Sequence, residues 1–236
     1  MFVNYAHRGA SEHAPENTLL AFYTGVYMGA NGIETDVQRT KDGILVLFHD
    51  DTIFRLTGAP GSIQDYTLEQ LRQFTFENNG LTDKIVVLED FLQQFGWRDL
   101  TFAIEIKQAG IESQVVDMIR KYGIQSKTIV TSFMLDSVRA TKEYAPEQKV
   151  GFLTRPLSDA LLAELKSIGA EQLCPEAPDV TADDVARWHA QGFEVRAWGV
   201  KNEELMRRVC EAGADGMTVN FPDKLTQYLA QKTEEK

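Results

Sequence analysis

The chain has 236 residues, of which 43% are hydrophobic and 25% are charged, and its formal net charge is -11 at pH 7. This length and composition fit one globular domain with a sizeable core and exclude a disordered chain. The acidic balance argues against a general nucleic-acid or membrane binder, because both surfaces are anionic and attract clustered Lys and Arg.

Short apolar runs alternate with amphipathic stretches along the chain, which is typical of βα units around a parallel sheet. We expect nine strands, over residues 2–6, 32–37, 44–48, 101–106, 128–133, 149–153, 172–175, 194–200 and 216–219. The second and third are separated only by residues 38–43, too few for a parallel crossover, so the third returns as a hairpin strand. The remaining eight predict an α/β fold, a TIM-type (β/α)8 barrel.

Helices are expected between the strands, and several of them end near a glycine. Their predicted ranges are 17–28, 111–122, 135–144, 158–168, 182–191, 203–212 and 224–231. Asn17 is a plausible N-cap for the first helix, because its side chain can accept a backbone hydrogen bond. This repeated order of helix, glycine and strand supports the prediction of a barrel.

One segment breaks this repeated order. Residues 52–95 contain several turn-forming residues and a single short helical stretch at 68–74, and no full βα unit fits there. We therefore predict a single domain over residues 1–236 with an insertion at about 52–95, packed over or beside one rim of the barrel.

Cys174 and Cys210 fit no metal-site spacing and are expected to be reduced. The N-terminus lacks the features of a signal peptide, and no run approaches the ~20 apolar residues of a membrane span. The sequence therefore predicts a cytoplasmic protein with no stable membrane association, and it leaves the oligomeric state open.

Three carboxylates are predicted to lie at one mouth of the barrel, where barrel enzymes carry their sites. Glu34 and Asp36 are two residues apart in a strand and share a face, and Glu105 ends the next barrel strand. Such carboxylates repel one another unless they are protonated or bridged by a cation. They suit one hard divalent cation, Mg²⁺ or Ca²⁺, with Mn²⁺ also possible.

Basic and titratable side chains follow the same strand ends. His7 and Arg8 directly follow the first strand, His49 ends the hairpin return strand, and Lys107 lies two residues after Glu105. A facing pair of histidines can supply a general base and a general acid to a displacement at phosphorus. Arg8, Lys107 and a cation can neutralise charge on the non-bridging oxygens.

A set of motifs extends over nearly the whole chain: His7-Arg8-Gly9, Pro15-Glu16-Asn17-Thr18, Gly32-Ile33-Glu34-Thr35-Asp36-Val37, Thr40-Lys41-Asp42-Gly43, His49-Asp50, Glu105-Ile106-Lys107, Ser132-Phe133, Ala197-Trp198 and Gly213-Ala214-Asp215-Gly216. In order and spacing, this set resembles the glycerophosphodiester phosphodiesterase family. The resemblance implies hydrolysis of small glycerophosphodiester substrates to glycerol 3-phosphate and an alcohol. It also implies that His7 and His49 are the acid/base pair, and that Glu34, Asp36 and Glu105 hold the metal.

For the substrate, the resemblance implies that Arg8 and Lys107 contact the phosphate and that Trp198 packs against the glycerol or the leaving group. Direct attack by water and attack by the substrate's own hydroxyl, through a cyclic phosphate, both stay open. Two alternatives to this activity are a lysophospholipase D-like or other phosphodiesterase, and a non-catalytic protein that binds a phosphorylated metabolite.

Overall fold

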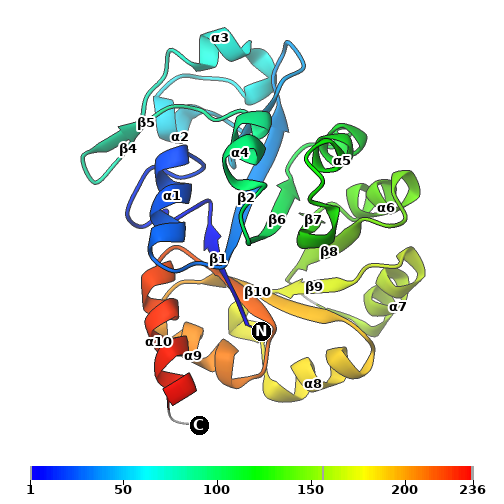
Figure 1. The fold of residues 1–236 in the computed structure, drawn as a ribbon. Coiled ribbons are helices and arrows are strands. Elements are labelled where there is room, and N and C mark those ends of the chain that lie inside the picture. Colours follow the sequence, from blue (N-terminus) through cyan, green and yellow to red (C-terminus); the bar gives the residue numbers. More distant parts are fainter. Residues whose placement is uncertain (1, 156, 235–236) are drawn as a thin grey trace.

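Eight parallel strands form a closed barrel in the computed structural model, which describes residues 2–155 and 157–234. Around the barrel they run β1, β2, β6, β7, β8, β9, β10 and β11, and β1 pairs with both β2 and β11. Their bounds are Val3–His7, Gly32–Arg39, Thr101–Ile106, Thr128–Ser132, Lys149–Thr154, Gln172–Pro175, Glu194–Val200 and Gly216–Val219. The predicted TIM-type barrel is confirmed (Figure 1).

The short strand β3, Leu45–Leu47, lies outside the closed barrel and pairs antiparallel with the end of β2. The register places Val37 opposite Leu47 and Arg39 opposite Leu45. Gly43 adopts a φ of 86° in the connecting turn, a conformation that favours glycine. The predicted hairpin is therefore present, and it returns the chain to the mouth of the barrel.

Helices cover the outside of the barrel (Figure 1). The seven that were predicted are α1 Leu19–Tyr27, α5 Glu112–Lys121, α6 Leu135–Tyr144, α7 Asp159–Ile168, α8 Ala182–Ala190, α9 Glu203–Glu211 and α10 Pro222–Glu234. The predicted cap of α1 is wrong, because the Thr18 side chain, not that of Asn17, accepts from the backbone N–H of Ala21. Within the part of the chain that the structure describes, no helix is both long and apolar enough to cross a membrane.

The segment between β3 and β6 forms a small subdomain at one side of the barrel (Figure 1). Its elements are α2 Phe54–Thr57, the 3-10 turn η1 Ile63–Asp65, α3 Leu68–Leu71, the hairpin strands β4 Phe76–Asn78 and β5 Leu81–Asp83, and finally α4 Leu88–Phe95. Buried residues such as Phe48, Ile53 and Phe76 give it a hydrophobic cluster of its own. The helix α4 instead packs into the barrel's main core, and the sequence analysis did not predict it.

The main hydrophobic core lies between the strands and the helices around them. Outward-facing residues of the strands, such as Ile33, Phe102 and Val195, join the helices in one continuous cluster. The inward-facing positions alternate with these and are largely polar, including Tyr5, Glu34, Glu105, Thr131, Gln172, Arg196 and Thr218, all of them buried. The barrel interior is therefore built for polar chemistry.

Candidate active site

Three buried carboxylates meet at the mouth of the barrel. Asp36 on β2 lies opposite Glu105 on β6 in the strand register, and Glu34 lies two residues before Asp36 on the same face. One oxygen from each carboxylate lies within 4.8 Å of the others, and the three residues are at most 6% exposed. The structure thus brings together the predicted metal ligands.

The electrostatics of this cluster favour a bound cation. Burial raises the pKa of Glu34 well above its usual value, and the negative charges of Asp36 and Glu105 raise it further. The pKa of Glu105 is raised by burial and by Asp36. One oxygen of Asp36, Oδ1, is buried and has no hydrogen-bond partner among the described residues. A hard divalent cation would satisfy that oxygen and relieve the repulsion, so the donor set fits such an ion.

Two cationic side chains each pair with one carboxylate of the cluster. The Nε of Arg8 lies 3.3 Å from Oδ2 of Asp36, and the Nζ of Lys107 lies 2.8 Å from Oε1 of Glu105. Although burial opposes it, the charge of Arg8 holds the pKa of Asp36 below its usual value. Both predicted phosphate contacts therefore lie beside the carboxylates.

The two predicted catalytic histidines are held through the same ring nitrogen. The Nδ1 of His7 lies 2.6 Å from Oδ1 of Asn220, and the Nδ1 of His49 lies 2.7 Å from Oδ1 of Asp50. Because these partners are acceptors, each Nδ1 carries a proton, so Nε2 of each ring is the nitrogen that can take up or give a proton in a reaction. Burial and the charge of Arg8 lower the pKa of His7 to about 4, so its ring is neutral at pH 7.

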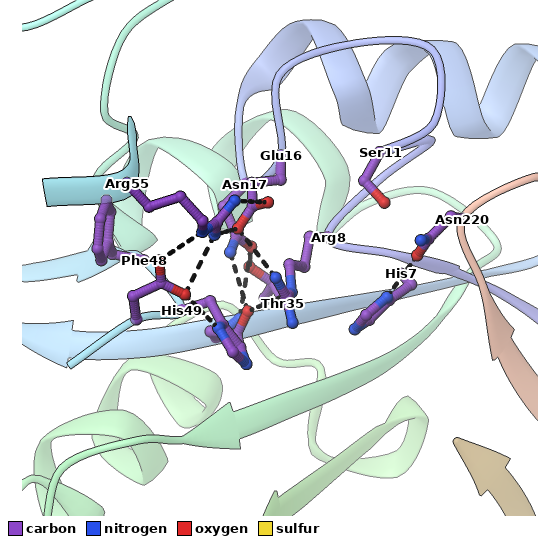
Figure 2. Close-up of polar contacts among 12 residues, drawn as sticks. His7, Arg8, Ser11, Glu16, Asn17, Thr35, Phe48, His49, Arg55 and Asn220 are labelled. Atoms are coloured by element: carbon purple, nitrogen blue, oxygen red, sulfur yellow. Dashed lines mark hydrogen bonds and ion pairs between the residues drawn. The ribbon is translucent and has the colours of Figure 1, made fainter. Parts of the chain in front are cut away.

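Arg55, an arginine from the subdomain, connects the side chains around Arg8 with those around His49 (Figure 2). Arg55 of α2 donates to Glu16 at 2.6 and 2.9 Å and to Asp50 at 2.6 and 3.1 Å. Glu16 also accepts from Arg8 at 2.9 Å. The result is a continuous polar network from Arg8 to His49 through Arg55. The network was not predicted from the sequence, where its local signal is the Pro15-Glu16-Asn17-Thr18 motif, interpreted as a helix start.

Asn17 bonds to side chains of β2 instead of capping a helix. Its backbone has a φ of 56°, in the left-handed region that Asn tolerates. Its Nδ2 donates to Oδ2 of Asp36 at 2.9 Å, and its Oδ1 accepts from the Thr35 hydroxyl at 2.8 Å. Asn17 therefore fixes the Asp36 carboxylate through a contact that sequence reasoning did not anticipate.

A cavity of about 250 Å³ opens above the carboxylates. Of the predicted site residues, those that line it are His7, Arg8, Glu34, His49, Glu105 and Trp198. Asp36 and Lys107 are not part of its wall, but each bonds to a residue that is. The rings of Trp198 and Phe133 meet edge to face at 5.0 Å, and Phe133 also lies 5.8 Å from the Nζ of Lys107. The cavity thus has a charged floor and an aromatic side wall.

Comparison with known sequences identifies relatives over nearly the whole chain. Residues 7–224 match the Glycerophosphoryl diester phosphodiesterase family. A glycerophosphodiester phosphodiesterase of Caldanaerobacter subterraneus subsp. tengcongensis is 34% identical over 95% of this chain and 96% of its own length. The enzyme of the same name from Bacillus altitudinis is 32% identical over 93% of this chain and 95% of its own.

Solved structures share the fold. A phosphodiesterase from Oleispira antarctica, in complex with the product sn-glycerol-3-phosphate, superposes with a TM-score of 0.88 and 25% identity, covering 97% of this chain and 96% of its own. A glycerophosphodiester phosphodiesterase from Parabacteroides distasonis superposes with a TM-score of 0.84 over 98% of each chain, at 23% identity.

Proposed function

The chain belongs to the glycerophosphodiester phosphodiesterase family, and from this premise we propose that it hydrolyses small glycerophosphodiesters to glycerol 3-phosphate and an alcohol with a divalent cation. The observation that carries the proposal is the buried cluster of Glu34, Asp36 and Glu105 at the floor of a cavity that both histidines line. We infer that these three carboxylates hold the cation. When bound, it supplies positive charge to the phosphoryl oxygens as a Lewis acid.

Arg8 and Lys107 add positive charge to that of the cation. Each lies beside a carboxylate at the cavity floor, so each can turn toward a phosphate that enters above it. Cationic donors placed where charge develops stabilise the transition state more than the ground state. We infer that they bind the two non-bridging oxygens of the diester.

His7 and His49 move the protons. The phosphorus–oxygen bond to the alcohol breaks as a hydroxyl oxygen attacks from the opposite side. One histidine takes the proton of the attacking oxygen on its Nε2, and the other, protonated, gives its proton to the leaving alcohol. The attacking hydroxyl is that of water, or that of the substrate's glycerol with a cyclic phosphate as intermediate. Asn220 and Asp50 keep each ring in the orientation these transfers need.

Trp198 forms the wall next to the reacting phosphate. Its indole Nε1 donates to the backbone oxygen of Thr154 at 3.2 Å, and its ring packs edge to face with that of Phe133, so the ring is held in place. An aromatic face of this kind suits the carbon skeleton of the glycerol or of the leaving group.

The test is to strip metal from the purified protein with a chelator and supply glycerophosphocholine and glycerophosphoethanolamine. Restoring Mg²⁺, Ca²⁺ or Mn²⁺ in turn should restore release of glycerol 3-phosphate. His7→Ala and His49→Ala should abolish turnover while the fold is kept. Near-normal rates in both variants would contradict the assigned roles, and faster cleavage of acylated glycerophosphocholine would point to a lysophospholipase D-like activity.

A further inference from the structure

Arg196 is a fully buried cation inside the barrel. It lies on the inward face of β10 and is 1% exposed. Its Nε donates to Oε1 of Gln172 at 2.9 Å, its Nη2 lies 3.4 Å from Sγ of Cys174, and its guanidinium lies 5.3 Å from the centre of the Tyr5 ring. It also lines the cavity above the carboxylates. Arg196 therefore contributes to the wall of the proposed active site from inside the barrel.

These contacts are with neutral groups. No ion pair joins Arg196 to any carboxylate in residues 2–155 and 157–234. Burying a guanidinium without a carboxylate partner is costly, because the interior cannot solvate its charge as water does. The fold therefore keeps a charge here that it does not use in a structural ion pair.

The carboxylate cluster has one member without its own cationic side chain. Asp36 pairs with Arg8 and Glu105 with Lys107. Glu34 accepts from the backbone N–H of Arg8 at 3.1 Å and lies 3.9 Å from Nε2 of the neutral His7. Arg196 and Glu34 line the same cavity, and the charge of Glu34 is one of those that act on the guanidinium. Arg196 thus supplies the third positive charge against three negative ones.

We propose that Arg196 is a positioning residue whose buried charge weakens cation binding at Glu34, Asp36 and Glu105 and strengthens binding of the phosphate above it. The proposal rests on the proposed function, since it takes these carboxylates as the metal ligands. Three carboxylates and three cationic side chains cancel in formal charge. With a divalent cation the site keeps two positive charges, and without Arg196 only one would remain to attract an anionic substrate.

The experiment measures binding of Mn²⁺ to the metal-free protein by calorimetry, and of glycerol 3-phosphate to the metal-loaded protein. Arg196→Met should bind Mn²⁺ more tightly, by about threefold or more, and glycerol 3-phosphate more weakly by a similar factor. Arg196→Lys is the matched control, since it keeps the charge and should stay near the wild type in both. Removing a residue that only supported the fold would weaken the binding of both ligands. Opposite changes in the two affinities therefore identify an electrostatic role.

A second variant neutralises the charge in place. Gln172→Glu puts a carboxylate at the atom that already accepts from the Nε of Arg196, with almost no change in shape. It should move both affinities in the same directions as Arg196→Met, and it decides the question if that variant does not fold. If the wild type binds Mn²⁺ and the folded variants bind it equally or more weakly, the inference about Arg196 is overturned while the proposed metal site stands. A wild-type protein that binds no Mn²⁺ would overturn the proposed metal site and the inference with it.

Discussion

Removing Arg55 should disturb both the stability and the chemistry of the protein, because this side chain links the subdomain to the barrel mouth. Arg55→Ala deletes hydrogen bonds of 2.6 and 2.9 Å to Glu16 and of 2.6 and 3.1 Å to Asp50. Asp50 in turn holds Nδ1 of His49 at 2.7 Å. The substitution therefore leaves His49 with a carboxylate partner that is no longer fixed.

The size of the effect follows from exposure. Glu16 and Asp50 are 14% and 22% exposed, whereas Arg55 is 49% exposed, so solvent screens part of the interaction. Discounting paired, charge-assisted hydrogen bonds for this screening, we expect the free energy of unfolding to fall by about 1–2 kcal/mol. A loosened His49 should lower kcat/KM by about tenfold, or ~1.4 kcal/mol of transition-state stabilisation.

The assay combines urea unfolding with steady-state hydrolysis of glycerophosphocholine and with Mn²⁺ affinity. The affinity for Mn²⁺ should change little, because Arg8 and Asn17 still hold Asp36. The matched control is Arg139→Ala, which removes an exposed ion pair with Glu164 on the outer helices. If Arg55→Ala behaves like Arg139→Ala in both stability and kcat/KM, the proposed coupling of the subdomain to His49 is refuted.

The same variant has a predictable pH dependence. Although burial opposes them, hydrogen bonds from Arg55 lower the pKa of Glu16 and of Asp50. A carboxyl with a lowered folded-state pKa adds stability above its unfolded pKa of about 4, and loses it as the pH falls through the lowered value. The stability gap between wild type and Arg55→Ala should therefore be largest near neutral pH and close under acid conditions. A gap that stays constant down to pH about 3 would contradict this reasoning.

Further tests probe single positions. Asn17→Gly keeps the φ of 56° but loses the hydrogen bond to Asp36, so Mn²⁺ affinity should fall by about tenfold, as calorimetry can measure. Gly9→Ala would place a Cβ 2.4 Å from the carbonyl carbon of Ala21 at a φ of 80°, so it should cost about 3 kcal/mol or more in urea unfolding. Cys174 is 0% exposed and burial raises the pKa of its thiol, so it should resist a thiol reagent until the protein unfolds. These predictions would be contradicted by wild-type Mn²⁺ affinity in Asn17→Gly, by normal stability in Gly9→Ala, or by rapid labelling of Cys174 in the folded protein.

The barrel could be predicted because its signals are local. Short apolar runs mark the strands, and the short turn at residues 38–43 forces the hairpin. The three-residue strands β4 and β5 carry too few positions for such a pattern, and the sequence analysis missed them. The helix α4 was missed because it directly follows the irregular segment, although Leu88 and Phe95 pack into the main core.

The carboxylates and histidines could be predicted from their places at strand ends, but their supporting contacts could not. Asn17 and Thr18 are both suitable caps by type, and the choice is settled by the bond from Asn17 to Asp36, 19 positions away. Arg55 meets Glu16 across 39 positions. Arg196 lies two residues before Trp198 in a strand, yet only the closed barrel shows that it lines the same cavity as Glu34 and Glu105.

The outward and inward faces of the barrel strands have different roles. Folding is driven by the outward face, where residues such as Ile104 and Val130 join the surrounding helices in the main core. Polar side chains lie on the inward face, where Glu105 and Thr131 alternate with those apolar residues on β6 and β7. Inward side chains could thus be exchanged in evolution or in the laboratory while the hydrophobic shell stays unchanged. A barrel of this kind can therefore gain a new reaction through changes to its inward side chains without losing its fold.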